Sequence, residues 1–303
     1  MLRSQAIPSQ RSVPDPLSVL ELLKPITWFA PMWALGCGVV SSAAPISENL
    51  LPVAGAIILA GPMVCGTSQA VNDWFDRHVD AINEPGRPIP SGRVPGRWAL
   101  YIACLWTCLS LMLAAALGAW VFWAAVFGLA LAWAYSAPPF RLKRNGWWGN
   151  AAVGLCYEGL PWFTGAAAML TVLPDWRIIS LALLYSIGAH GIMTLNDFKS
   201  VEGDRKLGLR SLPARYGIGP AAKLACWVMA VPQVAVIGLL ISWDRGLHAA
   251  IISVSLVVQF MLMHRLLKDP EGKAAWYNAT GTTLYVLGML AAAFAVRTLQ
   301  AGA

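Results

Sequence analysis

Charge is scarce in this chain. Only 12% of its 303 residues are Asp, Glu, Lys or Arg, whereas 57% are hydrophobic. A soluble domain usually has about 25% charged and roughly 45–50% apolar residues. The composition therefore excludes an ordinary soluble enzyme, because there is too little charge to cover its surface. It also excludes a disordered chain, since disordered chains are poor in apolar residues. A membrane protein with several spanning helices remains.

Metal-binding cysteine and histidine patterns are also missing. None of the six cysteines has Cys-x-x-Cys spacing, and all of them lie in apolar stretches, so no disulfide framework is implied. Cys104 and Cys108 would share a helix face, and we interpret them as packing residues rather than as a metal pair. The four histidines form no cluster of the zinc-binding type. No basic stripe with interleaved aromatic residues accompanies the net charge of +7, so nucleic acid is not an expected partner.

Long apolar runs, in contrast, are abundant. One bilayer span takes about 20 mostly apolar residues. Nine candidate spans lie near 27–45, 52–71, 98–117, 119–137, 148–169, 177–196, 221–241, 247–266 and 276–296. Residues 1–24 lack the compact apolar core and cleavage site of a signal peptide. We therefore predict an all-α polytopic membrane protein, with a polar N-terminal arm (1–24) and a single transmembrane domain (25–303).

The basic residues are distributed unevenly between the two sides of these spans. Arg177, Arg245 and Arg297 lie on one side, whereas the other 19 of the 22 Lys and Arg residues lie in the N-terminal arm and in alternate loops. Basic loops usually stay in the cytoplasm. The pattern predicts a cytoplasmic N-terminus and cytoplasmic acidic loops, with the lipid bilayer as the protein's surroundings.

The chain contains an internal repeat. Asn72-Asp73 ends the second span and Asn196-Asp197 ends the sixth, and each pair is followed by further acids and by an Arg-x-x-Pro that begins at Arg87 or Arg210. An offset of four helices indicates two four-helix repeats plus one helix. Parallel repeats of this kind would place both polar segments at the same membrane face, around a central cavity.

The acids of these two loops are the candidates for chemistry. Asn72, Asp76 and Asp80 recur every four residues and would share one helix face, where like charges repel unless a cation or solvent lies between them. A solvated acidic cap is the alternative, but it does not explain two clusters in matching repeats. Oxygen donors of this type suit Mg²⁺, which commonly bridges carboxylates to a phosphate. The predicted metal ligands are Asn72, Asp76, Asp80, Asp197 and Asp204, and the other predicted catalytic residues are Asp73, Asn196 and Glu202.

Basic residues accompany both acidic loops. They are Arg77, Arg87, Arg141, Lys143, Arg205 and Arg210. Arginine can bind phosphate oxygens through two parallel hydrogen bonds. The predicted ligand is therefore a diphosphate carrying Mg²⁺ at the cytoplasmic mouth of a membrane cavity. A diphosphate substrate that is buried in a membrane is most naturally a prenyl diphosphate.

The motif Asn72-Asp73-x-x-Asp76-x-x-x-Asp80 resembles the first aspartate motif of the UbiA superfamily of intramembrane prenyltransferases, and the resemblance covers roughly residues 20–297. Four segments are similar to the chlorophyll and bacteriochlorophyll synthase subfamily: residues 72–92, 135–150, 157–162 and 196–213. One departure concerns the second motif, which reads Asp-x-x-x-Asp in many members. The corresponding positions here are Ser200 and Asp204, so Asp197, Glu202 and Asp204 all stay open as metal ligands.

The resemblance implies a reaction. A geranylgeranyl or phytyl group would pass from its diphosphate to the propionate of bacteriochlorophyllide, with chlorophyllide or another UbiA acceptor as alternatives. That carboxylate is already ionised at neutral pH, so no strong general base is needed. The resemblance also implies a bacterial inner membrane, either cytoplasmic or intracytoplasmic and photosynthetic, and association with neighbouring pigment-pathway enzymes. A transporter is disfavoured, because transporters keep ionisable groups near the bilayer midplane. A non-catalytic pigment-binding protein would not need two acidic loops.

Aromatic and buried polar residues supply the remaining candidates. Tyr135, Trp147, Trp148 and Trp162 lie in or beside the matched segments and could contact the tetrapyrrole or the prenyl chain, although Trp is also common at membrane interfaces. Glu158 lies deep in the fifth span, where it would orient substrate or form a structural hydrogen bond. His190 could ligate the pigment's central magnesium, but a hydrogen bond between helices is the favoured interpretation.

Overall fold

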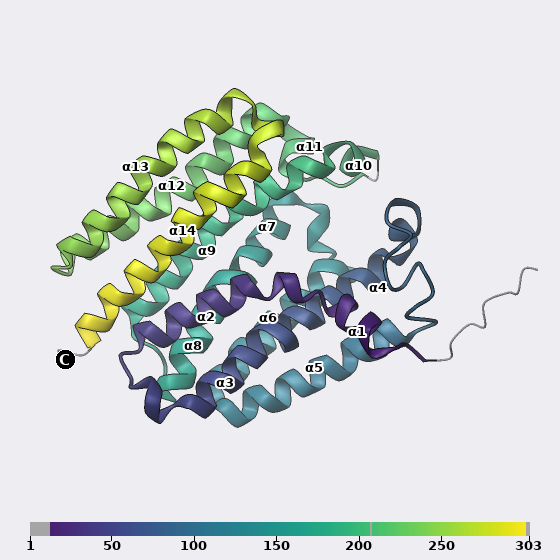
Figure 1. Cartoon of the computed structure of the whole chain (residues 1–303), viewed down its shortest axis with the longest axis horizontal. Coiled ribbons are helices and arrows are strands. Elements are labelled where there is room, and N and C mark those ends of the chain that lie inside the picture. Colours follow the sequence, from purple (N-terminus) through teal and green to yellow (C-terminus); the bar gives the residue numbers. More distant parts are fainter. Residues whose placement is uncertain (1–12, 207, 301–303) are drawn as a thin grey trace, which may run out of the picture.

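The computed structural model describes residues 13–206 and 208–300, and within them every regular element is a helix (Figure 1). The α-helices are α1 (Pro16–Leu23), α2 (Phe29–Ser41), α3 (Leu50–Ile58), α4 (Gly66–Asn83), α5 (Trp98–Leu117), α6 (Ala119–Ser136), α7 (Gly146–Gly154), α8 (Leu160–Leu170), α9 (Trp176–Asn196), α10 (Val201–Lys206), α11 (Leu212–Tyr216), α12 (Ile218–Ser242), α13 (Gly246–Lys268) and α14 (Pro270–Gln300). Short 3-10 turns form η1 (Pro25–Thr27), η2 (Ile46–Glu48), η4 (Leu142–Arg144) and η6 (Asp197–Ser200), and π-helical turns form η3 (Leu59–Cys65) and η5 (Leu155–Gly159).

Seven stretches of the described chain are long and apolar enough to cross a membrane. They are Leu50–Asn83, Trp98–Leu117, Ala119–Ser136, Trp176–Lys206, Ile218–Ser242, Gly246–Lys268 and Pro270–Gln300. The other two predicted spans are also helical. Helix α2 has only 13 residues, about 20 Å at 1.5 Å per residue, and the fifth span is divided into α7, η5 and α8. The all-helical membrane fold is therefore confirmed, although the first predicted span is short.

The predicted N-terminal arm is partly helical. Residues 1–12 lie outside the described part of the chain. Asp15 caps α1 by accepting a hydrogen bond from the backbone N–H of Ser18, and Leu22 and Leu23 are buried in one cluster with Ala70 of α4. Lys24 then ends the helix in a left-handed conformation. The arm thereby brings Lys24 beside the first acidic motif.

The helices form two groups. In Figure 1, α3, α5 and α6 lie together on one side, whereas α9, α12, α13 and α14 lie together on the other. Helix α2 packs against both α8 and α14 and so links the two groups. This close approach depends on glycine, because a Cβ atom at Gly38 would lie 1.9 Å from the Trp162 carbonyl oxygen. Small residues at helix contacts are typical of membrane bundles.

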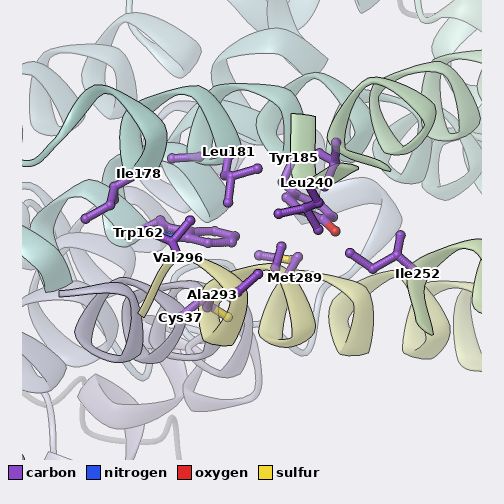
Figure 2. Close-up of a cluster of buried hydrophobic side chains, with 14 of the residues drawn as sticks. Cys37, Trp162, Ile178, Leu181, Tyr185, Leu240, Ile252, Met289, Ala293 and Val296 are labelled. Atoms are coloured by element: carbon purple, nitrogen blue, oxygen red, sulfur yellow. The ribbon is translucent and has the colours of Figure 1, made fainter. Parts of the chain in front are cut away.

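A large apolar cluster fills the space between α2, α8, α9 and α14 (Figure 2). The ring of Trp162 stacks on Tyr185 with the ring centres 5.7 Å apart, and its Nε1 donates to the Ser41 hydroxyl. The Tyr285 hydroxyl donates to the Tyr185 carbonyl oxygen at 2.6 Å. These contacts join α2, α8, α9 and α14 through side chains that are buried in the bundle.

Two π-helical turns interrupt helices that line a cavity inside the bundle. Pro62 lies inside η3 and has no N–H to donate, and η5 lies between Gly154 and Leu160. Cys65 of η3 and Tyr157 of η5 both line the same cavity. Single π turns within α-helices frequently lie at functional sites. The helical periodicity of the sequence does not predict them.

Candidate active site

A polar cavity of 190 Å³ brings the two acidic motifs together. Its lining residues are Asn72, Asp76, Tyr135, Lys143, Gly146, Gly149, Asn150, Asp197, Ser200, Asp204, Leu209 and Ser211. The last turns of α4 supply the first motif, and the end of α9 with η6 and α10 supplies the second. The two motifs are far apart in sequence but face one cavity, as expected for repeats with their polar ends on the same side.

The acids of the first motif are each paired with a cation. Both Asp76 oxygens accept hydrogen bonds from Lys143 Nζ, at 2.6 and 2.5 Å. Lys24 Nζ lies 2.6 Å from Asp73 Oδ1, and Asp73 is buried. Charge repulsion along α4 is therefore relieved by basic residues from three other segments, since Arg87 pairs with Asp80 at 2.8 Å.

Lys143 is the cation of the cavity itself. Its side chain is 10% exposed, and burial lowers the pKa of its ammonium group, while the facing Asp76 carboxylate opposes part of that shift. Arg141 Nη2 lies 3.5 Å from the same carboxylate. Two basic side chains thus approach Asp76 at the polar cavity that both acidic motifs line.

Hydroxyl and amide groups fix the acids of the second motif. Asn150 Nδ2 donates to Asp197 at 3.3 Å. The Ser211 hydroxyl donates to Asp204 at 2.5 Å, and Ser200 donates to the same oxygen at 3.2 Å. No basic side chain lies within 4 Å of either acid in the described chain, so hydroxyl and amide groups, rather than cations, hold these two side chains beside the cavity.

A backbone link joins the basic loop to the second motif. The Arg210 N–H donates to the Arg144 carbonyl oxygen, and the Gly146 N–H donates back to the Arg210 carbonyl oxygen, each at 2.9 Å. A Cβ atom on Gly146 would lie 2.6 Å from the Leu212 nitrogen. Only glycine permits this close approach, which brings the loop of Lys143 and the second motif to the same cavity.

The donors fit Mg²⁺ better than a softer metal. Carboxylate and amide oxygens line the cavity, with no Cys or His among its walls. Within the described residues, no three Asp, Glu, His or Cys side chains converge enough to hold an ion unaided. Mg²⁺ commonly binds through one or two carboxylates together with waters and substrate phosphates. A metal here would therefore need ligands in addition to these side chains.

Two less polar cavities continue from this site. One of 470 Å³ shares Asn72 and Tyr135 with the polar cavity. A narrower one of 50 Å³ shares Tyr157 and Cys156 with the second. Its walls contain small residues: Ala60, Ala124, Ala125, Gly128 and Ala132. The walls of the three cavities therefore change from charged to apolar.

Several other predicted acidic and amide residues lie outside the polar cavity. Asp73 and Asp80 are buried in their ion pairs and do not line it. Glu202 is exposed on α10. Asn196 lines the 470 Å³ cavity, and its side-chain oxygen Oδ1 accepts a hydrogen bond from Asn278 Nδ2 at 2.7 Å. Of the five predicted metal ligands, Asp80 is the one that is not a cavity wall.

The predicted basic residues divide in the same way. Lys143 lines the polar cavity and Arg141 reaches Asp76. The Arg77 guanidinium instead lies over the Trp74 ring, 4.1 Å from its centre. The side chains of Arg205 and Arg210 are exposed. Arg87 belongs to the ion pairs of Asp73, Asp80 and Glu84.

The aromatic candidates lie in different surroundings. Tyr135 lies at the junction of the polar cavity and the 470 Å³ cavity. Trp148 is 67% exposed, and Trp147 donates to the Tyr216 hydroxyl. Trp162 is completely buried in the cluster of Figure 2. Tyr135 is therefore the aromatic candidate that faces the site.

The two deep ionisable candidates are buried. Glu158 is 5% exposed, and its Oε2 has no hydrogen-bond partner among the described residues. His190 is 7% exposed, neither ring nitrogen has such a partner, and its ring centre lies 5.3 Å from that of Trp147. Neither residue lines the three cavities described above, so a role in substrate binding stays a prediction.

Sequence reasoning missed several residues of the site. Asn150 and Ser211 hold the second-motif acids, Ser136 accepts from Asn72, and Lys24 pairs with Asp73. Asn150 and Ser211 lie inside segments that match the subfamily, which was the available signal. Lys24 had none, because a lysine before a membrane helix is ordinary.

Comparisons with known proteins agree with this architecture. The model of the UbiA prenyltransferase family matches residues 28–286. The bacteriochlorophyll synthase 33 kDa chain of Cereibacter sphaeroides is 60% identical over 96% of both chains. The chloroplastic chlorophyll synthase of Oryza sativa is 40% identical over 91% of this chain and 76% of its own. A UbiA homolog from Archaeoglobus fulgidus, solved with GPP and Mg²⁺, superposes with a TM-score of 0.73, at 21% identity over 93% of this chain and 99% of that one.

The family match covers most of the chain, including all residues of the polar cavity. The superposition on a solved UbiA homolog agrees with the all-helical bundle. The chain therefore belongs to the UbiA prenyltransferase family.

Proposed function

We propose that this enzyme esterifies bacteriochlorophyllide, by transferring a geranylgeranyl or phytyl group from its diphosphate to the pigment's propionate with the help of Mg²⁺. The similarity to bacteriochlorophyll synthase over 96% of the chain supports this acceptor, since similarity to plant chlorophyll synthase is lower. Chlorophyllide is the alternative acceptor.

The observation that carries the proposal is the series of adjoining cavities. Asp76, Asp197 and Asp204 line the polar end together with Lys143, and Ala124, Ala125 and Gly128 line the narrow apolar end. A diphosphate needs cations at its head, whereas an isoprenoid tail needs apolar walls that exclude water. One molecule with both parts suits this arrangement.

The residues of the polar cavity would divide the work. Bound Mg²⁺ would supply positive charge to the departing diphosphate. Lys143 and Arg141 would bind and orient the diphosphate oxygens. Asp76 and Asp204 would bind the Mg²⁺ ion. The face of Tyr135, at the junction with the next cavity, is placed to stabilise positive charge at the prenyl carbon. The propionate arrives already ionised, so no protein base is required.

The apolar walls have a second role. An allylic cation reacts with water, and excluding water prevents such side reactions. The 470 Å³ cavity offers both a polar edge at Asn72 and Asn196 and apolar walls at Val153 and Met193. It is therefore the natural place for the reacting ends of both substrates, with only the far end of the donor's tail reaching the narrower cavity beyond Tyr157.

The polar cavity would open toward the cytoplasm of a bacterial inner membrane. The uneven distribution of basic residues supports this orientation. Neighbouring enzymes of pigment synthesis remain predicted partners.

Product formation by the purified protein in detergent tests the proposed reaction. Geranylgeranyl or phytyl diphosphate would be supplied with bacteriochlorophyllide or chlorophyllide, and the products separated by chromatography. We expect an esterified pigment, with bacteriochlorophyllide as the better acceptor. Faster turnover of chlorophyllide would reassign the acceptor. The absence of ester from folded protein with both pigments would refute the proposal.

A further inference from the structure

A groove lies between α12 and α13, on walls separate from the cavities of the candidate active site. It has two adjoining parts, of 210 and 560 Å³, which share Phe260 and His264. The first part lies between the two helices, whereas the second continues along α13, which supplies all of its walls. Lys223 and Trp227 of α12 line the first part, and Arg265 and Lys268 of α13 line the second. The two helices lie side by side along their length (Figure 1).

One end of the groove carries three free positive charges. Lys223 lies near the start of α12, whereas Arg265 and Lys268 lie in the last turn of α13, so all three belong to the same end of the helix pair. All three are exposed, and none has an acidic partner within 4 Å among the described residues.

Acidic residues near this end do not cancel the charge. Asp269 and Glu271 follow α13 directly, and Asp269 already accepts a hydrogen bond from the Gly272 N–H at 3.1 Å. Lys273 adds a fourth positive charge beside them, so four basic residues stand against these two acids. The end of the groove therefore keeps a net positive charge.

The rest of the groove is apolar. Trp227 is 65% exposed and lies one helical turn after Lys223. Phe260 is 45% and Met261 62% exposed, one turn before His264 and Arg265. Both helices therefore change from basic to apolar in the same direction, from their shared end toward the middle of the bundle. This matches the change from headgroup to acyl chain in one leaflet of a bilayer.

We propose that this groove binds an anionic phospholipid, with its phosphate held by Lys223, Arg265 and Lys268 and an acyl chain packed along Trp227, Phe260 and Met261. Basic pockets between membrane helices suit anionic headgroups. A zwitterionic lipid would leave the positive end without a counter-charge. The site is separate from the reaction proposed above and does not depend on it.

Native mass spectrometry of the full-length, delipidated protein in a nonionic detergent tests the site. The probes are phosphatidylglycerol and phosphatidylcholine with identical acyl chains. We expect phosphatidylglycerol to bind at least tenfold more tightly. Each basic residue near a membrane surface contributes about fivefold in affinity for anionic lipid. Lys223→Gln, Arg265→Gln and Lys268→Gln combined should therefore weaken phosphatidylglycerol binding on the order of a hundredfold and leave phosphatidylcholine binding unchanged.

A matched control removes the same charge elsewhere. Arg97, Arg144 and Lys206 are exposed and line neither part of the groove. Their combined replacement by Gln should change phosphatidylglycerol affinity less than threefold, and circular dichroism would confirm that both triple variants fold. Equal losses in the two triple variants would show diffuse attraction and overturn the proposal.

Two further measurements separate a lipid from other occupants. Trp227→Ala combined with Phe260→Ala should weaken phosphatidylglycerol binding, because the acyl chain loses its wall. Glycerol phosphate, which has no acyl chain, should compete poorly. Full competition by glycerol phosphate would indicate a simple anion site. Equal binding of both phospholipids to the unmodified protein would show that the groove does not recognise an anionic headgroup. Either result would contradict the proposal.

Discussion

Replacement of Lys143 by Gln isolates the role of the buried cation in the polar cavity. Lys143 Nζ lies 2.6 and 2.5 Å from the two oxygens of Asp76, and its side chain is 10% exposed. Removing one donor aimed at developing charge typically costs about 2.7–4 kcal/mol of transition-state stabilisation. We therefore expect kcat/KM for the prenyl diphosphate to fall on the order of 10²–10³-fold.

The fold should tolerate this change. Asp76 is 20% exposed and keeps Arg141 at 3.5 Å, so the loss of stability should stay below the roughly 3–5 kcal/mol that breaking a fully buried ion pair costs. Steady-state kinetics with a fixed acceptor concentration and a thermal unfolding curve would be measured on the same preparation.

Arg144→Gln is the matched control, because Arg144 is adjacent in sequence, exposed and not a wall of the polar cavity. Its kcat/KM should stay within about threefold of the unmodified enzyme. A Lys143→Gln enzyme with comparable activity would refute the assignment of Lys143 to the diphosphate.

Three further changes test the cavities and the packing. Gly128→Leu would fill the 50 Å³ cavity, so turnover of a C20 diphosphate should fall at least tenfold while a C10 diphosphate is still used in the same kinetic assay; equal losses would contradict the assignment of the tail. Gly38→Ala would place a methyl group 1.9 Å from a backbone oxygen of α8, whereas nothing lies within 4 Å of a Cβ atom at Gly36; only Gly38→Ala should lower the unfolding temperature, and equal effects would argue against close packing of α2. The amides of Gln233 and Gln259 exchange hydrogen bonds at 3.0 and 3.1 Å, so Gln233→Leu should destabilise by about 1–2 kcal/mol and the double Leu variant should recover much of this; a double variant that unfolds more easily than the single one would be the contrary result.

The sequence predicted the broad fold because its signals are strong and local. Long apolar runs identify spans wherever polar residues bound them, as at Trp98–Leu117 and Gly246–Lys268. The predicted span 27–45 is longer than α2 at both ends, because the helix begins only at Phe29 and ends at Ser41, just before Ala43 takes a left-handed conformation. The π turn at Leu155–Gly159 was also missed, since apolar composition does not distinguish π from α hydrogen bonding.

The candidate site was predicted in part for a related reason. Spacing of four residues placed Asn72 and Asp76 on one face, and both line the polar cavity. The same spacing grouped Asp80 with them, but Asp80 lies further along α4 and is paired with Arg87. Spacing along one helix cannot show where a cavity ends. The extent of the cavity depends on the loop from Arg141 to Asn145, which pairs through its backbone with Arg210.

Burial narrows the choice of candidate metal ligands among the acids of the second motif. Asp197 and Asp204 line the polar cavity, whereas Glu202 is exposed on the other face of α10. Neighbours within one short helix can thus have different surroundings, and the sequence alone did not separate them.

The most direct test of the central claim is the activity of Asp76→Ala, Asp204→Ala and Glu202→Ala, each measured with and without EDTA. The claim is that one acid from each motif acts on the same Mg²⁺-bound diphosphate. We predict that the unmodified enzyme makes ester only without EDTA, that the first two variants lose more than 99% of activity while staying folded, and that Glu202→Ala retains most of it. Full activity of Asp76→Ala or Asp204→Ala, or full activity of the unmodified enzyme in EDTA, would contradict the account.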